Sequence, residues 1–212
     1  PLNQTRHTYA SILIGPEPKS RVKAVHHNAL PYAQVPAFVE KLREGEGIGR
    51  LAFEALILTA ARSGEIRLAT WSEIDLEAKA WTIPAARMKA GRAHVVPLSQ
   101  PAIDALIKAK AFREAHSDLI FPGRVSGKPL SDMTLTKICR DMGVNAVPHG
   151  FRSSFRDWVA EETDFDGAIA EMALAHSISN KVEAAYRRGN LLEKRRKLME
   201  TWGAYCAGRA LI

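Results

Sequence analysis

The segment GRLAFEALILTAARSGEI, residues 49–66, is the most apolar part of this chain. Its apolar side chains recur at the spacing of one helical face, at Leu51, Ala55, Leu58 and Ala61. This pattern predicts a buried helix that ends at Arg62, where an unpaired charge would be costly. An ion pair with Glu65 or Glu73 would explain an arginine at this place, and so would a bound anion.

The segments around this helix predict a mainly α-helical protein with a small antiparallel β-sheet. The strand-forming residues 81–83 and 95–96 flank a Gly-containing turn, which predicts a hairpin with basic residues near its tip. Proline and glycine signals delimit the remaining segments. Helices are expected at residues 36–45, 101–116, 131–143, 148–162, 166–176, 179–188 and 191–206.

The chain divides into an N-terminal arm and one larger domain. Residues 1–30 are rich in Pro, His and Lys/Arg and show no clear periodicity, so we interpret them as a linker or arm. Because the chain starts at Pro1 rather than at methionine, we expect a missing N-terminal region before this arm. Residues 31–212 are predicted to form the domain itself, which is long enough for one hydrophobic core and includes the expected helix 191–206.

Basic side chains are concentrated at the two ends of the chain. The formal net charge is +7 overall, with +3 in residues 1–30, −1 in residues 31–180 and +5 in residues 181–212. Such an uneven excess is typical of proteins that bind nucleic acids, although a solubilising basic tail would have the same composition.

The composition argues against several other classes of function. No apolar run is long enough to cross a bilayer, so no membrane partner is expected. Cys139 and Cys206 are far apart and lack metal-ligand spacing, which indicates a reduced, cytoplasmic protein. The sequence contains no Walker-type phosphate loop and no clear carboxylate or His/Cys array for a metal. We therefore expect neither a cofactor nor a metal ion.

Cationic side chains and one tyrosine remain as candidates for chemistry on phosphodiesters. Lys89 lies in the predicted hairpin turn, where a flexible ammonium group can bind a phosphate or donate a proton. His149 and Arg152 are three residues apart at a helix start, so they share a face at the positive end of the helix dipole. His176 comes ten residues before Tyr186. Taken singly, each residue also has an ordinary explanation as a packing, capping or surface group.

The order of these residues resembles the catalytic domain of tyrosine recombinases, in particular the integrases of prophages and genomic islands. The resemblance covers about residues 31–206. It is carried by the segments ARSGEIRLATWSEID, HGFRSSFRDW and HSISNKVEAAYRR, which begin at Ala61, His149 and His176 and are similar to the box motifs of that subgroup in wording, order and spacing. Six matched positions in one order are a far stronger signal than any single pair.

The resemblance implies a role for each matched residue. Arg62 and Arg152 would clamp the scissile phosphate, and Lys89 would protonate the leaving 5′-oxygen. Tyr186 would be the nucleophile that forms a 3′-phosphotyrosyl intermediate. Because the cations neutralise the charge that develops on the phosphate, the resemblance implies chemistry without a divalent metal.

Supporting roles follow from the same resemblance. His149 and His176 would complete the phosphate-binding and proton-handling set, and Glu65 would orient the first arginine. The DNA backbone would be contacted by Arg92, Arg187 and Arg188. One departure is visible, because the family usually has Leu-Gly-His before the second histidine and this chain has Ala175 in place of the glycine. The change matters only if this position needs a positive φ.

The function implied is that of a site-specific DNA recombinase that integrates or excises a prophage or genomic island. Its expected partners are double-stranded DNA attachment sites, further copies of itself in a tetrameric synapse, and accessory DNA-bending proteins of the host or the element. It would act in the bacterial cytoplasm, at the nucleoid when bound to DNA. The resemblance also suggests that residues 191–206 pack into a neighbouring protomer, whereas the pattern alone equally fits docking onto the chain's own core.

Two other functions remain as alternatives at this point. A type IB topoisomerase uses arginine, lysine, histidine and tyrosine in a similar way, but it relaxes supercoils as a monomer. A catalytically idle DNA-binding or excision-accessory module would use the basic ends only to hold the DNA backbone. The amino acids of the motifs favour the integrase over the topoisomerase. The intact set of six residues argues against the idle binding module.

Overall fold

The computed structural model describes residues 28–176 and 191–209 of the chain. The predictions made for Tyr186, Arg187, Arg188 and the helix at 179–188 therefore lie outside the described residues. The α-helices are α1 (Val35–Arg43), α2 (Ile48–Thr59), α3 (Ser63–Arg67), α4 (Gln100–Ala109), α5 (Met133–Asp141), α6 (Phe151–Glu162), α7 (Gly167–Ala173) and α9 (Leu192–Cys206). The strands are β1 (Ile74–Asp75), β2 (Ala80–Ile83) and β3 (His94–Pro97). The short 3-10 helices are η1 (Tyr32–Gln34), η2 (Trp71–Glu73), η3 (Ala85–Arg87), η4 (Lys110–Phe112) and η5 (Pro148–Gly150).

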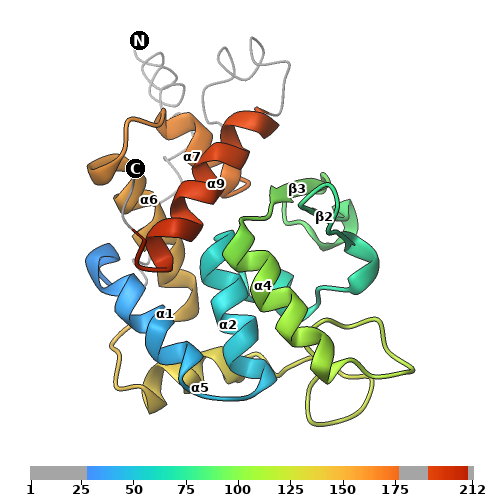
Figure 1. Ribbon diagram of the computed structural model, residues 1–212. Helices are drawn as coiled ribbons and strands as arrows, with labels where there is room; N and C mark the ends of the chain where they lie inside the picture. Colours follow the sequence, from blue (N-terminus) through green and yellow to red (C-terminus); the bar gives the residue numbers. More distant parts are fainter. Residues whose placement is uncertain (1–27, 177–190, 210–212) are drawn as a thin grey trace, which may run out of the picture.

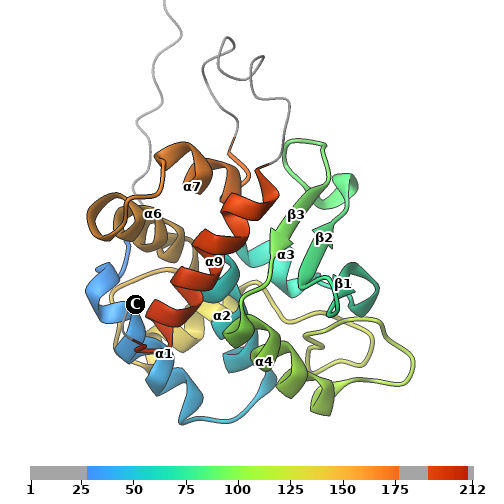
Figure 2. The same cartoon turned by 45° about the horizontal axis from the view of Figure 1, so that its top comes forward.

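Helix α2 is the centre of the structure. It contacts α1, α3, α4, α5 and α9 (Figures 1 and 2). Every residue from Ala52 to Thr59 is buried, as its near-continuous apolar sequence predicts. The one carboxylate in this stretch, Glu54, is compensated by Arg43 of α1, whose guanidinium nitrogen lies 2.7 Å away. A buried charge with a direct partner is tolerated at a position where an isolated one would not be.

The end of this helix differs from the prediction. Helix α2 stops at Thr59 because Ala60 adopts the left-handed conformation, with φ 50° and ψ 26°. Arg62 consequently does not end the apolar helix. It has an extended backbone and directly precedes the short helix α3. The sequence contains no glycine or proline at this break, so the usual local signal for a helix end was missing.

The predicted hairpin is confirmed and carries one additional short strand. The three strands are antiparallel in the order β1-β2-β3. In β2, Trp81 and Ile83 are buried while Thr82 is exposed, so one face of the sheet packs on the helices. Trp81 is paired with Val96 in the β2–β3 register. The fold is therefore mainly α-helical with a small antiparallel sheet, as predicted.

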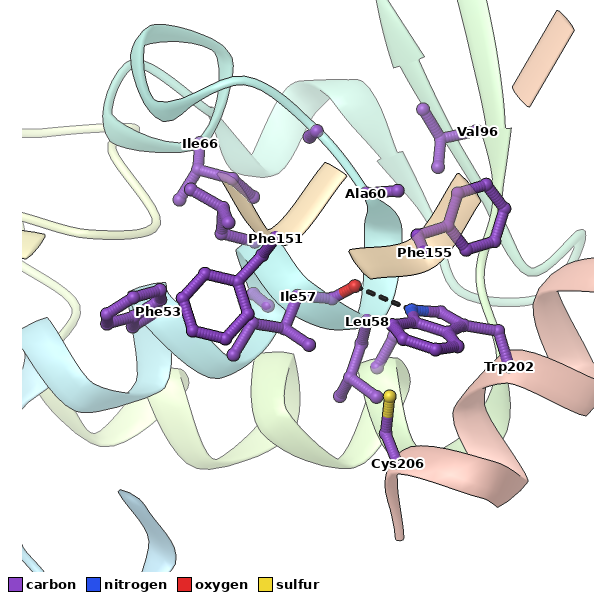
Figure 3. Packing of buried hydrophobic residues seen from close by; sticks show 14 of the residues in the cluster. Phe53, Ile57, Leu58, Ala60, Ile66, Val96, Phe151, Phe155, Trp202 and Cys206 are labelled. Carbon is purple, nitrogen blue, oxygen red and sulfur yellow. Dashed lines mark hydrogen bonds between the residues drawn. The ribbon is translucent and has the colours of Figure 1, made fainter. Parts of the chain in front are cut away.

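Aromatic side chains join the helices into one core, part of which Figure 3 shows. Phe53 of α2 packs edge-to-face against Phe151 of α6, with ring centroids 5.1 Å apart. On α6 and α9, Phe155 and Trp202 are in a similar arrangement at 5.4 Å. The indole N–H of Trp202 donates a hydrogen bond to the carbonyl of Ile57 at 2.8 Å (Figure 3). Because this indole is fully buried, the hydrogen bond removes the cost of desolvating its polar group.

Helix α9 packs onto the core of its own chain. It contacts α1, α2, α4, α7 and β3 (Figures 1 and 2). The buried residues that it contributes are Arg195, Leu198, Met199, Trp202, Gly203 and Cys206. The expectation that residues 191–206 pack into a neighbouring protomer is therefore wrong for this helix. The apolar face that suggested an intermolecular contact is already covered within the chain.

Replacing Trp202 with alanine should lower the free energy of unfolding by about 3–5 kcal/mol, because it removes a large buried ring and the hydrogen bond that its indole N–H donates to the Ile57 carbonyl. Urea denaturation followed by circular dichroism measures this loss. Lys197→Ala is the matched control on the exposed face of the same helix and should stay within about 0.5 kcal/mol of the unmodified protein. A small effect of Trp202→Ala would contradict the packing of α9 onto its own chain.

Candidate active site

The C-terminal end of α7 is a tight turn that presents backbone and side-chain groups toward α6. The N–H of Ala175 donates to the carbonyl of Met172 at 3.1 Å, and the N–H of His176 donates to the carbonyl of Glu171 at 2.9 Å. Ala175 itself is left-handed, with φ 51°. This pair of bonds around one left-handed residue is the Schellman arrangement that ends many helices.

Alanine is an unfavourable residue for this turn. A Cβ atom crowds the following carbonyl in the left-handed conformation, at a cost of about 1–2 kcal/mol that glycine avoids. The departure from the Leu-Gly-His pattern therefore does fall on a position with positive φ. The neighbouring residues hold the turn despite this strain, since Leu174 is buried and its carbonyl accepts a hydrogen bond from Arg152.

Arg152, near the start of α6, is the buried cation of the site, with 4% of its surface exposed. Its Nη1–H donates to the carbonyl of Ala60, and its Nη2–H groups donate to the carbonyl of Leu174 at 2.6 Å and to Nε2 of His176 at 3.1 Å. All three acceptors are neutral when the imidazole is neutral. Within the described part of the chain, Nε of Arg152 is buried without a hydrogen-bond partner.

The electrostatics of this arginine favour an anion. Burial and the neighbouring charge of Arg62 lower the pKa of Arg152 to about 10, which still leaves the guanidinium charged at neutral pH. None of these three hydrogen-bond partners is a carboxylate, although Glu65 and Glu171 are close enough to act on it through space. A buried charge with a free donor and only neutral contacts would be stabilised by an anionic ligand.

Arg62 and Glu65 form a local pair at the start of α3. The Glu65 carboxylate accepts from the backbone N–H of Arg62 at 2.8 Å and from its Nη1–H at 2.7 Å. Glu65 is buried, whereas the side chain of Arg62 remains one quarter exposed. One carboxylate thus accepts hydrogen bonds from both the backbone and the guanidinium of this arginine, while part of its side chain stays exposed. Glu73, the other partner considered from the sequence, instead pairs with Arg87.

His176 lies between α6 and α7 with a partner at each ring nitrogen. Its Nδ1 is 2.6 Å from a carboxylate oxygen of Glu171, and its Nε2 faces Arg152. The second oxygen of Glu171 accepts from Nε of Arg156 at 2.5 Å. Although partial burial acts to raise it, the hydrogen bonds from His176 and Arg156 hold the pKa of Glu171 below its ordinary value.

The loop between β2 and β3 carries two of the sequence-predicted residues. Lys89 and Arg92 are both exposed there, and within the described part of the chain neither joins the hydrogen-bonded cluster around Arg152. The start of the loop is held by Arg87, which donates to the carbonyl of Glu65 at 3.2 Å and to the carboxylate of Glu73 at 2.6 Å. Arg87 therefore ties the loop to α3 at a point two residues before Lys89.

His94 of β3 was not predicted as a site residue. Its Nε2–H donates to the carbonyl of Ala173 at 3.2 Å, which ties the hairpin to the end of α7. Burial and the nearby charge of Arg195 lower the pKa of His94 to about 4. Arg195 of α9 in turn donates to the carbonyl of Val95 at 2.6 Å. The available signal was strand alternation, because His94 shares the face of the buried Val96.

The remaining sequence-predicted residues are placed as follows. His149 is exposed in η5, one turn before Arg152. Tyr186, Arg187 and Arg188 lie outside the described residues. Among residues 28–176 and 191–209, no group of three or more His, Cys, Asp or Glu side chains could hold a metal ion. In the same part of the chain, no helix has both the length and the apolar character needed to cross a bilayer.

Comparison with known proteins identifies the family. The model of the phage integrase family matches residues 29–191, which is most of the chain. This protein belongs to the phage integrase family. The prophage integrase IntZ of Escherichia coli K12 is 36% identical over 180 residues, which cover 83% of this chain and 44% of IntZ. The integrase of enterobacteria phage P4 is 34% identical over 206 residues, which cover 88% of this chain and 47% of the phage protein.

Solved structures of recombinases share the fold of this integrase-family chain. The XerA recombinase has a TM-score of 0.59 at 15% identity, over 80% of this chain and 64% of that chain. A lambda integrase dimer, residues 75–356 bound to a COC′ core site, has a TM-score of 0.55 at 20% identity, over 73% of this chain and 59% of that chain. This chain spans about half the length of the curated integrases that it matches.

Replacing Ala175 with glycine should raise the free energy of unfolding of this integrase domain by about 1 kcal/mol, because glycine adopts the left-handed conformation without strain. Urea denaturation measures the change. Ala170→Gly, in the regular part of α7, is the matched control and should lower the free energy of unfolding by about 1 kcal/mol. Destabilisation by Ala175→Gly would show that the side chain contributes packing that outweighs the strain.

The folded protein should lose stability as the pH falls from about 6.5 to 4. In this window the unfolded chain takes up a proton at His94 that the folded chain, with a pKa of about 4 at this residue, does not bind. His94→Gln removes this titration, and the glutamine can still donate to the Ala173 carbonyl. Between pH 6.5 and 4 the variant should therefore lose about 1–3 kcal/mol less free energy of unfolding than the unmodified protein loses. Urea denaturation at several pH values measures the difference, with His116→Gln, at an exposed histidine, as the matched control.

Proposed function

We propose that this domain is the catalytic part of a site-specific DNA recombinase that cuts and rejoins DNA strands through a covalent 3′-phosphotyrosyl intermediate. The observation that carries this proposal is the buried guanidinium of Arg152, which is held by neutral acceptors and has a free Nε–H. Such a group stabilises an anion much better than a solvated arginine does, since the surrounding protein excludes water. A phosphodiester is the anion that the family membership suggests.

The proposed reaction begins with attack on a DNA phosphodiester. The hydroxyl oxygen of Tyr186 forms a bond to phosphorus while the bond to the 5′-oxygen breaks, which leaves the phosphate on the tyrosine and a free 5′-hydroxyl. Arg62 and Arg152 bind the non-bridging oxygens, where negative charge develops. Lys89 gives a proton to the leaving 5′-oxygen. The reverse reaction with a 5′-hydroxyl of another strand completes the exchange, so no high-energy cofactor is consumed.

The histidines would handle protons and bind the phosphate. A free phenol has a pKa near ~10 and is a poor nucleophile at neutral pH, so the tyrosine needs a base. His176 is suited to this task because its Nε2 accepts a hydrogen bond from Arg152 and therefore carries a lone pair on the side of the cationic cluster. His149, exposed one turn before Arg152, would contact the phosphate from the start of α6.

The partners follow from the same proposal. Double-stranded attachment sites would be bound with the help of Arg92, Arg187 and Arg188, and several copies of the protein would meet on the DNA in a tetrameric synapse. One solved structure with this fold, a lambda integrase tetramer bound to a Holliday junction, supports this arrangement. Accessory DNA-bending proteins would act with it at the bacterial nucleoid. The curated relatives are named as integrases, which favours recombination over the topoisomerase and accessory-module alternatives.

A nicked suicide DNA substrate that carries the attachment site should trap the protein as an SDS-resistant adduct in the presence of EDTA. The adduct is expected because the cations replace a metal and the nick lets the 5′-hydroxyl fragment diffuse away. Gel electrophoresis of labelled DNA measures adduct formation. Tyr186→Phe should abolish it, whereas the matched control Tyr205→Phe, at a tyrosine whose hydroxyl bonds the Tyr32 carbonyl, should retain it.

The assay should be done with the full-length protein as well as with this chain, because the curated relatives are about twice as long. An adduct that persists in Tyr186→Phe would refute the assignment of the nucleophile. Absence of an adduct with full-length protein and its own attachment site would refute the catalytic function and leave a binding module.

A further inference from the structure

We propose that Glu171 is a positioning residue that fixes the tautomer of His176, so that Nδ1 carries the proton and Nε2 stays open toward Arg152 and the phosphate site. The proposal concerns a residue that the sequence patterns did not single out. It deepens the proposed function and rests on it for the role of His176, while the geometry of the pair stands on its own.

Glu171 holds His176 at two points. Its carboxylate oxygen lies 2.6 Å from Nδ1 of the ring, and its backbone carbonyl accepts from the His176 backbone N–H at 2.9 Å. The second contact is part of the turn that ends α7. Because the two residues are joined through both backbone and side chain, the ring has little freedom to turn away from Glu171.

The two partners of the ring are compatible with only one neutral tautomer. An ionised carboxylate only accepts hydrogen bonds, so Glu171 requires a proton on Nδ1. A guanidinium only donates, so Arg152 requires a lone pair on Nε2. Both contacts select the same tautomer, and the contact to the Glu171 carboxylate, at 2.6 Å against 3.1 Å for Arg152, is the shorter and stronger one. The ring is therefore placed with its basic nitrogen facing the cationic cluster.

Arg156 also stabilises the negative charge of Glu171. Nε of Arg156, one turn after Arg152 on α6, donates to the other carboxylate oxygen at 2.5 Å. The hydrogen bonds from His176 and Arg156 outweigh partial burial and keep the pKa of Glu171 low, so the carboxylate stays ionised at neutral pH. The Arg156 side chain is largely exposed, so this outer ion pair adds little stability of its own.

The arrangement has a chemical consequence when Nε2 takes the proton of the attacking phenol. The resulting imidazolium carries N–H groups on both sides, with Glu171 as acceptor at Nδ1 and a phosphate oxygen as acceptor at Nε2. A carboxylate on the far nitrogen stabilises this cation and prevents the ring from flipping. In the resting site the single lone pair of Nε2 accepts from Arg152, so this hydrogen bond breaks when the proton arrives, while Arg152 keeps its hydrogen bond to the Leu174 carbonyl.

The tautomer can be measured directly. Long-range ¹H–¹⁵N NMR spectra of ¹⁵N-histidine-labelled protein, at mildly alkaline pH where imidazole is neutral, distinguish protonated from unprotonated ring nitrogens. His176→Ala assigns the signal among the seven histidines. We expect His176 to be protonated at Nδ1, and we expect Glu171→Gln to produce a mixture of tautomers, because an amide can donate as well as accept. A ring protonated at Nε2, or a tautomer unchanged in Glu171→Gln, would overturn the proposal.

Kinetics on the suicide substrate provide the second test. In metal sites, removing the residue that orients a histidine through its second ring nitrogen typically lowers activity by about 10–100-fold. We expect a decrease of that order in the rate of adduct formation for Glu171→Gln, because Glu171 contacts His176 in the same way. The affinity for the DNA substrate should change by less than about threefold, since Glu171 does not contact the phosphate. Glu171→Asp, which keeps the charge, should recover part of the rate.

Two variants separate positioning from a purely structural role. Arg156→Gln removes the outer ion pair between α6 and α7 but leaves the Nδ1 contact intact, so its rate should exceed that of Glu171→Gln at least severalfold. Glu161→Gln, at a carboxylate that accepts from the Tyr32 hydroxyl, is the matched control for the substitution itself and should react normally. Equal losses in Arg156→Gln and Glu171→Gln would overturn the proposal, since the effect would then come from the link between the helices.

The two tests also separate this inference from the proposed function. If full-length protein with its own site forms no adduct, the proposed function fails, yet the NMR spectra still show whether Glu171 sets the tautomer. If the adduct forms and Glu171→Gln reacts at the normal rate, the proposed function stands and the positioning role is refuted.

Discussion

The buried guanidinium of Arg152 is the interaction on which the rest of the site depends. It donates hydrogen bonds to the carbonyl of Ala60 after α2, to the carbonyl of Leu174 after α7 and to the ring of His176. Carbonyls at helix ends lack partners within the helix and must find donors elsewhere. One arginine supplies those donors for two helices at once. The same contacts that complete two helix ends thereby hold a positive charge in a place with little water.

Both of these helix ends are reached through a left-handed alanine. Ala60 has φ 50° after α2, and Ala175 has φ 51° after α7. Neither residue is favoured in this conformation, so contacts with the surrounding residues have to offset the backbone strain. Arg152 contributes at both places, because it binds the carbonyl of one of these alanines and the carbonyl directly before the other. The hydrogen bonds that place the Arg152 cation therefore also stabilise the two strained turns.

The hairpin and the last helix are attached to this centre by a second set of buried polar contacts. His94 joins β3 to the Ala173 carbonyl, and Arg195 of α9 joins the Val95 carbonyl. Arg195 belongs to the basic run that suggested a nucleic-acid-binding end of the chain, but it is buried and serves the fold. Helix α9 therefore supports β3, the strand that follows the Lys89 loop, in addition to covering the core with Trp202.

The sequence by itself determined most helices of the described part of the chain, the hairpin and the family, because these depend on local periodicity and on the order of a few residue types. The spacing of apolar residues in 49–66 predicted the central helix, and the motifs identified Arg62, Arg152 and His176 as candidate site residues. Only the tertiary structure decided that α2 stops at Ala60 and that α9 packs on its own chain. The physical reason is that these outcomes depend on partners more than ninety residues away along the chain, such as Ala60 with Arg152 and Ile57 with Trp202. His94 and Glu171 were missed for a related reason, since the role of a histidine or a carboxylate is set by the neighbours that folding places beside it.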